Sequence, residues 1–256
     1  MGNTFKKYAK IFDLIYKRKN YKSECDFLER VFKRYSQRRR IREILDIACG
    51  TGDHIICLAE RGFDVSAQDI SSDMLRIAKR KCYNKNLKIS FMGRFPMQQF
   101  KHKNKFDAVI AMFSSIDYVL KLKEVKQVFI NIRNCLRKKG LIVFDFWNKS
   151  SVEKNFTPCK RKVFCKGNEK VIRISRTSLD KKASVAKVHF ICDYFVNKKR
   201  VARIKELHRI KYYEISHMQK ILESCGFKVL GAFPFMYLDK KITDNDWNIS
   251  IVASCA

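Results

Sequence analysis

The chain is short of proline, glycine and acidic residues, and it has no long hydrophobic run. It contains 3 prolines and 9 glycines in 256 residues, with neither an internal repeat nor a low-complexity linker. No stretch approaches the ~18 uninterrupted apolar residues that suggest a membrane-spanning helix. The apolar core of a secretion signal is also missing, because Lys6, Lys7 and Lys10 interrupt the first residues. We therefore expect one domain, or one domain with an insertion, and no membrane span.

The 10 cysteines do not form a recognisable metal or redox motif. No two of them are spaced as C-x-x-C, and no cluster of histidine and cysteine has zinc-site spacing. Scattered thiols without a secretion signal suit a reducing compartment. We expect a cytoplasmic protein without a structural metal.

Acidic residues are outnumbered: 25 Asp and Glu face 55 Lys and Arg, which gives a formal net charge of +30. The densest basic segment spans residues 33–42, and other basic clusters are spread along the chain. Such a charge attracts anions, including nucleic acid and phosphorylated metabolites. Three interpretations stay open: a basic solvated surface without a specific role, an anionic small substrate, and a nucleic acid. A dedicated nucleic-acid face usually concentrates its charge on one surface.

A nucleotide-binding pattern is present at residues 44–53, ILDIACGTGD. An apolar strand ends in a turn with Gly50 and Gly52, and a helical pattern follows. A second strand, 63–68, delivers Asp69 at its carboxyl end. The glycines let the backbone approach a ligand closely, and the acid can accept hydrogen bonds from ribose hydroxyls. The pattern predicts a site for a nucleoside-bearing cofactor.

The third glycine of the dinucleotide fingerprint G-x-G-x-x-G is absent. Asp53 also adds negative charge at the helix N-terminus, where a pyrophosphate would bind. A ligand without phosphate fits better, although an NAD enzyme with a degenerate loop is the alternative. The pattern D-x-A-C-G-T-G with Asp69 resembles the class I S-adenosylmethionine-dependent methyltransferases.

This resemblance implies an α/β, Rossmann-like fold and S-adenosyl-L-methionine as the cofactor. The sheet is expected to have seven mostly parallel strands with helices on both faces, and an antiparallel β insertion follows strand five. The motifs imply that residues from the first four strands and from the N-terminal segment hold the cofactor. They are Tyr16, Asp46, Ala48, Gly50, Thr51, Gly52, Asp69, Ile70, Met74, Arg94, Phe95 and Met112. Arg94 departs from the family, which commonly has an acid there to meet adenine, so Arg94 either stacks on the ring or leaves adenine to apolar contacts.

Hydrophobic periodicity and the resemblance together divide the chain into four parts. A helical segment is expected at residues 1–40, the cofactor-binding core at 41–150, an antiparallel β insertion at 151–210, and the completion of the core at 211–256. The resemblance implies that the first segment is a lid and that the insertion covers the substrate. Within these parts we expect helices at 5–16, 23–35, 53–61, 73–83, 123–137 and 214–225. Ser72 is the expected cap of the fourth helical segment, and Gly140 is expected to end the fifth.

The segment FSSIDY (113–118) and the C-terminal part resemble bacterial small-molecule N-methyltransferases, including those that act on nucleotide-linked amino sugars. The methyl acceptor is therefore expected to be a small amine, anionic or nucleotide-linked, and the insertion could also support a homodimer. Tyr118 could orient the amine, although packing on the pocket wall is the alternative. Tyr16, in the expected lid, is a second catalytic candidate.

His208 is a further candidate, since Glu206 and His208 fall on one face of a strand and the acid could orient the imidazole as a base. A half-exposed histidine on a lid strand is the alternative. Asp117 points either at solvent or at the substrate. His54 is expected to cover the cofactor.

Against a nucleic-acid substrate, the Pro-Pro-aromatic tetrad of base N-methyltransferases is absent after the fourth strand. The sequence thus predicts a class I methyltransferase acting on a small molecule, with nitrogen as the favoured acceptor. An RNA methyltransferase and a non-catalytic binding protein of the same fold remain the two alternatives.

Overall fold

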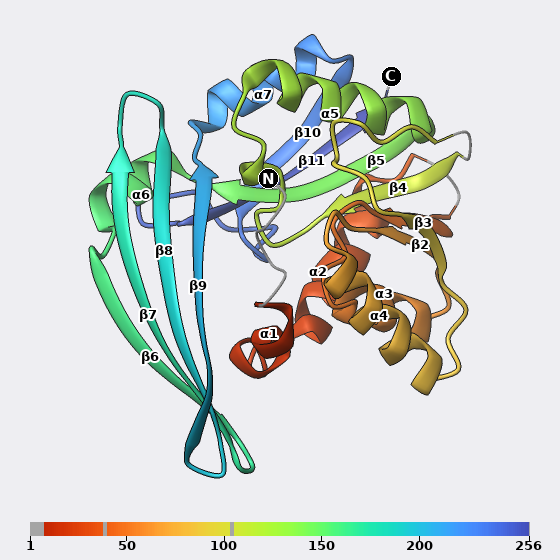
Figure 1. The fold of residues 1–256 in the computed structure, drawn as a ribbon. Helices are drawn as coiled ribbons and strands as arrows, with labels where there is room; N and C mark the ends of the chain where they lie inside the picture. The colour runs from red at the N-terminus through yellow and green to blue at the C-terminus, as the bar shows by residue number, and fades with distance from the viewer. Residues whose placement is uncertain (1–7, 38–39, 103–104, 256) are drawn as a thin grey trace.

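The computed structural model describes residues 8–37, 40–102 and 105–255. A seven-stranded sheet forms its centre, with the strand order β10-β11-β5-β4-β1-β2-β3 (Figure 1). Strands β1 to β5 run parallel, whereas β11 is antiparallel to β5 and to β10. The expected Rossmann-like fold is confirmed. The bounds are β1 (Glu43–Asp46), β2 (Asp64–Gln68), β3 (Ser90–Gly93), β4 (Phe106–Ala111), β5 (Leu136–Trp147), β10 (Phe227–Pro234) and β11 (Asn248–Cys255).

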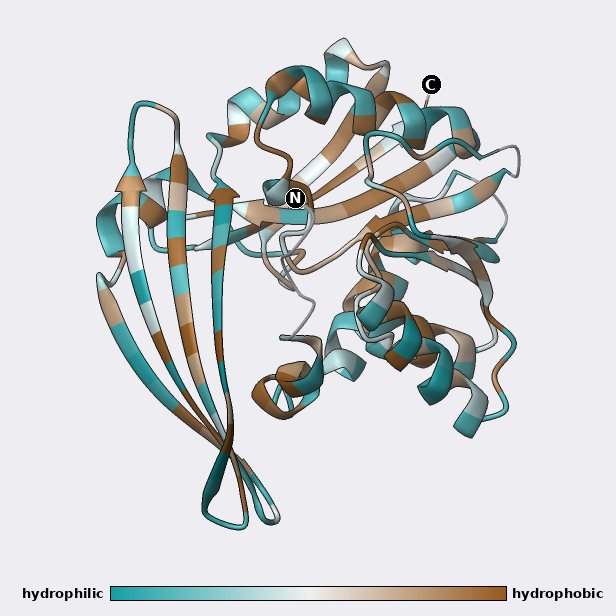
Figure 2. Ribbon diagram, in the orientation of Figure 1, coloured by the Kyte–Doolittle hydropathy of each residue, from teal (hydrophilic) through white to brown (hydrophobic). Residues whose placement is uncertain are grey.

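Helices cover both faces of this sheet. On one face, α5 and α7 pack against Leu45, Val109 and Ile142, and on the other, α2, α3 and α4 pack against Ile44 and Ile110. Figure 2 shows hydrophobic strands between helices whose colours alternate, as expected where each helix buries one stripe. The helices are α1 (Ala9–Ile15), α2 (Tyr21–Tyr35), α3 (Asp53–Glu60), α4 (Ser72–Asn84), α5 (Leu122–Cys135), α6 (Lys149–Asn155), α7 (Ile215–Ser224) and the 3-10 helix η1 (Ile116–Tyr118).

Both predicted helix caps differ from the structure. The N-cap of α4 is Ser71 rather than Ser72, and the Ser71 side chain accepts a hydrogen bond from the N–H of Met74. Gly140 does not end α5, because the chain enters β5 directly after Cys135. A Cβ at Gly140 would lie 2.8 Å from the carbonyl oxygen of Arg137, so this glycine permits a close approach inside an irregular strand.

The antiparallel insertion after β5 is confirmed as a second, four-stranded sheet. Its strands pair in chain order: β6 (Cys159–Lys166), β7 (Glu169–Asp180), β8 (Val185–Val196) and β9 (Lys199–Lys211). The sequence does not predict α6, which connects the two sheets. The sheet lies beside α1 in Figure 1, and α1 contacts β6, β7 and α4. The N-terminal segment therefore joins the second sheet to the cofactor-binding part of the core.

The expected N-terminal helix over residues 5–16 is described only from residue 8, and α1 begins at Ala9. Residues 1–7 lie outside the described ranges. No helix that the structure describes combines the length and the apolar character needed to cross a membrane.

Candidate active site

The loop between β1 and α3 has the open backbone that the sequence predicts. Gly50 has φ +55°, and a Cβ there would meet no atom within 4 Å, so the space beside it is free of protein. Gly52 has φ +91° and caps α3, and its Cβ would lie 3.0 Å from the Cβ of Ala78. Both positions favour glycine, the first for a left-handed turn next to open space and the second for close packing on α4.

Asp69 lies at the carboxyl end of β2 and holds this loop. Its Oδ2 accepts the N–H of Gly50 at 2.9 Å, and its Oδ1 accepts the N–H of Ser71 at 2.8 Å. Burial raises the pKa of the Asp69 carboxyl, and hydrogen bonds from the backbone N–H groups of Ser71, Gly50 and Ile70 oppose that rise. A carboxylate has about four lone-pair sites, so acceptor capacity remains on Asp69 for further donors such as ribose hydroxyls.

Asp46 lies on β1 below the same loop. Its Oδ1 accepts the N–H of Ala48 at 3.0 Å, and burial raises the pKa of its carboxyl to about 6. The adjacent Thr51 hydroxyl donates to Oδ1 of Asp13 at 2.6 Å, which ties α1 to the glycine loop. The N-terminal segment and the loop thus form one hydrogen-bonded unit.

The other expected cofactor residues lie around the ends of β2, β3 and β4. Met74 and Met112 are buried, whereas the Phe95 side chain is 46% exposed. The Nε–H of Arg94 donates to the carbonyl oxygen of Ile70 at 3.0 Å, so the guanidinium of Arg94 is fixed beside the loop after β2. This bond fits either role that the sequence leaves open for Arg94.

A buried ionic cluster beside the loop is not predicted from the sequence. His54 and Glu24 approach within 2.7 Å through Nε2 and Oε2, and Lys19 forms an ion pair with the same carboxylate. Burial first, and then the Lys19 charge, lower the pKa of His54 to about 4, so its imidazole is neutral at pH 7. Burial lowers the pKa of Lys19 to about 8. The sequence does place His54 next to the glycine turn, but it gives no signal for its partners.

The turn after β4 has a strained backbone. Phe113 and Ser114 have φ values of 65° and 55°, which non-glycine residues rarely adopt. The buried carboxylate of Asp145 on β5 accepts hydrogen bonds from the backbone N–H and the hydroxyl of Ser114. Asn248 on β11 donates to the same carboxylate oxygen. Asp145 therefore holds the position at which Phe113 leaves the sheet.

Three predicted polar residues meet next to this turn. The Tyr118 hydroxyl lies 2.8 Å from Nδ1 of His208, and Nε2 of His208 lies 3.2 Å from Oε2 of Glu206. His208 is 2% exposed, so the alternative of a half-exposed histidine is wrong. The placement of Glu206 and His208 on one strand face is confirmed. Burial raises the pKa of the Tyr118 hydroxyl well above its usual range.

Two neighbours complete this region. Asp117 is fully buried and its Oδ2 accepts the N–H of Trp147 at 2.8 Å, so the alternative that it points at solvent is wrong. The Tyr16 ring packs edge-on against Phe113, with centroids 5.0 Å apart. Tyr16 is thus brought to the carboxyl end of β4, where ligands bind in open α/β sheets.

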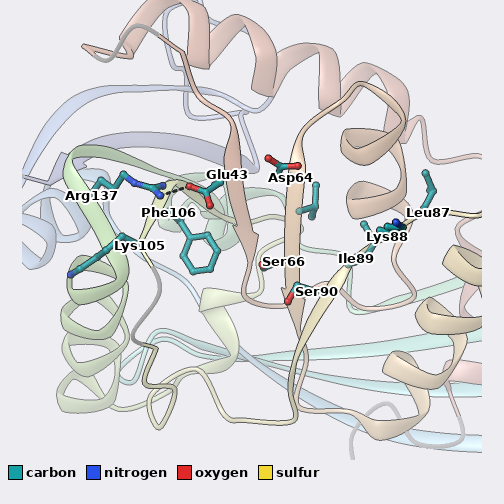
Figure 3. Close-up of a pocket in the computed structure, with 11 residues that line it drawn as sticks. Glu43, Asp64, Ser66, Leu87, Lys88, Ile89, Ser90, Lys105, Phe106 and Arg137 are labelled. Atoms are coloured by element: carbon teal, nitrogen blue, oxygen red, sulfur yellow. Dashed lines mark ion pairs between the residues drawn. The ribbon is translucent and has the colours of Figure 1, made fainter.

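A cavity of about 800 Å³ lies at the opposite edge of the sheet, near the amino ends of its strands (Figure 3). The ion pair between Glu43 and Arg137 forms part of its wall, and Lys88 and Lys105 add positive charge. None of the predicted site residues lines this cavity, so it has no part in the site built above.

Comparison with known proteins identifies the kind of domain that carries this site. Residues 44–140 match the family model of a methyltransferase domain. The chain contains a class I, S-adenosylmethionine-dependent methyltransferase domain. The chain is 29% identical over 229 residues to a methyltransferase homologue of Geobacillus sp. (strain WCH70), and the match covers 89% of this chain and 90% of that protein.

Two further similarities extend over most or all of the chain. The chain is 27% identical over 225 residues to the dTDP-3-amino-3,6-dideoxy-alpha-D-glucopyranose N,N-dimethyltransferase of Streptomyces fradiae, covering 86% of this chain and 84% of that enzyme. The crystal structure of an S-adenosylmethionine-dependent methyltransferase from Clostridium acetobutylicum superposes with a TM-score of 0.83 at 20% identity and covers 99% of both chains. At that identity the superposition shows the shared fold.

The residues present fit S-adenosylmethionine. The open space at Gly50 and the buried acceptor at Asp69 match a nucleoside without phosphate, and Asp46, Met74 and Met112 lie around them. When bound, the cofactor supplies an electrophilic methyl group on a sulfonium. Among the described residues, no three His, Cys, Asp or Glu side chains are grouped so that they could hold a metal ion.

Proposed function

We propose that this methyltransferase transfers the methyl group to the nitrogen of a small amine, an amino sugar or a similar acceptor. The observation that carries the proposal is the hydrogen-bonded chain of Tyr118, His208 and Glu206 at the carboxyl end of β4. A relative that matches most of the chain is named for the N,N-dimethylation of a dTDP-linked amino sugar. This similarity supports an amine as the acceptor.

Methyl transfer to nitrogen has two requirements. The acceptor must be aligned with the methyl carbon, and positioning of this kind supplies up to ~7–11 kcal/mol in favourable cases. An amine must also lose a proton, since the ammonium form has no lone pair to attack. A positioned base contributes about 10²–10⁴-fold. The residues after β4 are therefore expected to orient the amine and to accept its proton.

The chain of Tyr118, His208 and Glu206 can do both. In the neutral tautomer that satisfies both contacts, the Tyr118 O–H donates to Nδ1 of His208, and Nε2–H donates to Glu206. The Tyr118 oxygen then accepts an N–H of the amine. As that proton moves to the Tyr118 oxygen, the hydroxyl proton moves to His208, and the imidazolium is stabilised by Glu206. Because burial disfavours the phenolate, Tyr118 relays the proton to His208 and remains a neutral phenol.

Three further parts of the proposal concern the surroundings of the reaction. We infer that α1 acts as a lid, since Tyr16 and Asp13 connect this helix to Phe113 and to the glycine loop. We infer that the four-stranded sheet covers the acceptor, because it supplies His208 and Glu206. All 10 cysteines are free thiols, which supports a cytoplasmic location, and a homodimer stays a prediction.

The test is a methylation assay with donor labelled in the methyl group. The purified chain is incubated with a panel of dTDP-linked amino sugars, free amino sugars and amino acids, and separately with bulk RNA. We expect label on the nitrogen of one class of small amine. Label on RNA, together with RNA binding that weakens steeply with salt, would instead support the RNA methyltransferase. Absence of donor binding in calorimetry would support the non-catalytic alternative.

A further inference from the structure

The face of the four-stranded sheet that contacts α1 carries two cations opposite each other. Lys162 on β6 pairs with Arg173 on β7 in the antiparallel register, so their side chains lie on the same face. Arg173 donates from Nη1 to the hydroxyls of Tyr8 at 3.0 Å and Tyr16 at 3.4 Å, which identifies this face as the one toward α1. Like charges directly opposite each other destabilise a strand pair. A bound anion would remove that cost.

Arg173 has no anionic partner among the described residues. Its hydrogen bonds go to two neutral hydroxyls, and its guanidinium lies over the rings of Phe190 (4.9 Å) and Phe164 (5.2 Å). Its Nε is buried and lacks a hydrogen-bond partner in the part of the chain that the structure describes. A guanidinium has five N–H donors, so most of its hydrogen-bonding capacity is unused. A cation removed from water without a counter-ion is costly, and this cost favours binding of an anion.

Lys162 is more exposed than Arg173, but the nearest charges that act on it are also positive. Its pKa is lowered by partial burial and by the neighbouring charges of Lys160 and Arg173. The part of this face formed by β6 and β7 is therefore positively charged, whereas Glu206 lies on the same face two strands away and accepts the N–H of Tyr8. An oxyanion between Lys162 and Arg173 would meet a point charge from one strand and a planar fork of donors from the next, which suits a carboxylate or a phosphate group.

The position of this pair connects it to the proposed chemistry. The Tyr16 hydroxyl that accepts from Arg173 belongs to the ring that packs against Phe113 after β4. On the other side, the Phe190 ring under the guanidinium lies 4.7 Å from the His208 ring. Arg173 thus contacts Tyr16 and Phe190, and the rings of these two residues pack against Phe113 and His208 at the proposed amine site.

We propose that Arg173 and Lys162 bind an oxyanion of the methyl acceptor, a carboxylate or a phosphate group, beside Tyr16. The statement that this anion belongs to the acceptor rests on the proposed function. The substrate class would then be a small amine that carries an acidic group, and the two cations would select it against neutral amines of the same size.

The test measures binding without methyl transfer, so its result is independent of the methylation assay. The full chain is saturated with S-adenosylhomocysteine and titrated in a calorimeter with acetate, inorganic phosphate and the neutral acetamide. We expect acetate or phosphate to bind and acetamide not to bind. The tighter of the two anions identifies whether the acceptor carries a carboxylate or a phosphate.

Substitutions locate the anion. We expect Arg173→Met to weaken anion binding at least tenfold and Lys162→Met to weaken it severalfold, while the affinity for S-adenosylhomocysteine stays within twofold. Arg173→Lys keeps the charge without the fork and should weaken binding less than Arg173→Met; it also serves if the methionine variant does not fold. Arg161→Met and Arg176→Met remove neighbouring cations from the opposite face, and they should bind anions as the wild type does.

Three results would overturn the inference. They are a wild type that binds neither anion, equal losses in Arg173→Met and Arg176→Met, and acetamide binding as tightly as acetate. A chain that binds the anion at Arg173 but methylates no amine would contradict the proposed function alone.

Discussion

The carboxylate of Asp145 is the anchor of Ser114: one oxygen accepts both the backbone N–H at 3.0 Å and the hydroxyl at 2.9 Å. Asn248 donates to the same oxygen at 2.7 Å, so three donors meet one buried acceptor. Left-handed backbone at a non-glycine residue costs about 1–3 kcal/mol, and Phe113 and Ser114 both adopt it. Asp145 offsets that cost, and it thereby places the segment that carries Tyr118.

Asp145→Ala should consequently destabilise the protein more than the loss of a single hydrogen bond. We expect the free energy of unfolding to fall by about 3 kcal/mol, because the Ser114 N–H and the Asn248 amide lose a charged acceptor. Urea unfolding followed by circular dichroism measures this. The matched control is Ser114→Ala, which removes only the hydroxyl and should cost about 1 kcal/mol. Equal losses in the two variants would contradict the role of Asp145 as the anchor of this turn.

Asp69→Ala should abolish most of the affinity for the cofactor. The carboxylate offers acceptors to a ribose and also holds the N–H groups of Gly50 and Ser71, so both the ligand contacts and the loop are lost. Hydrogen bonds to a charged group are worth about 1.5–3 kcal/mol, which corresponds to an affinity loss of about 10–150-fold. Calorimetry with S-adenosylhomocysteine measures it.

Asp64→Ala serves as the control for that measurement. Asp64 begins the same strand, but its carboxylate is largely exposed and pairs with Arg42 at the other edge of the sheet. The Asp64→Ala variant should bind S-adenosylhomocysteine with the affinity of the wild type. If Asp69→Ala bound the ligand as well as Asp64→Ala does, the assignment of the loop as the nucleoside site would be wrong.

The parts of the site that are local in sequence are predictable, and those that join distant segments are not. The glycine turn and Asp69 follow from strand–turn–helix spacing, and period-two alternation places Glu206 and His208 on one face. That alternation cannot reveal that the partner of His208 is Tyr118, since the pairing depends on how the second sheet docks on the first. The ion pair of Lys19 with Glu24 and the opposition of Lys162 and Arg173 escape prediction for the same reason.

Local patterns also mislead where tertiary contacts decide. A glycine after an amphipathic helix is typical of a helix end, but Gly140 lies within β5 because the chain there approaches the Arg137 carbonyl too closely for a side chain. Adjacent serines are equivalent as caps by residue type alone. The course of the backbone after Asp69 selects Ser71.

The buried His54 should make the protein acid-sensitive. Its pKa is about 4 in the folded protein and about 6.5 when unfolded, so the unfolded state binds more protons between these values. The stability that neutral His54 provides is present above pH 6.5 and is lost as the pH falls toward 4, by up to about 3 kcal/mol. His54→Gln keeps an N–H donor for Glu24 but does not titrate.

Unfolding in urea at pH 7.0, 6.0, 5.0 and 4.5 compares the two proteins. The difference in unfolding free energy between wild type and His54→Gln should shift in favour of the variant as the pH falls. His189→Gln, which replaces an exposed histidine on β8, should leave the pH dependence of the wild type unchanged. A constant difference between wild type and His54→Gln across this range would show that His54 titrates normally in the folded protein.

Tyr118→Phe should reduce the rate of methyl transfer while leaving donor binding intact. The substitution keeps the ring but removes the hydroxyl that contacts Nδ1 of His208, so the amine loses its acceptor and the route for its proton. We expect kcat to fall by about 10²–10⁴-fold, with the affinity for S-adenosylhomocysteine within twofold of the wild type.

His208→Gln retains an acceptor for the Tyr118 hydroxyl but cannot take up the proton. It should therefore keep the acceptor KM and lose kcat, whereas a residue that merely packs on the pocket wall would change KM and kcat together. Rates measured with a labelled donor at saturating amine separate these cases. The two substitutions should also be non-additive, because each interrupts the same proton path, and a double variant much slower than either single variant would show that Tyr118 and His208 act independently.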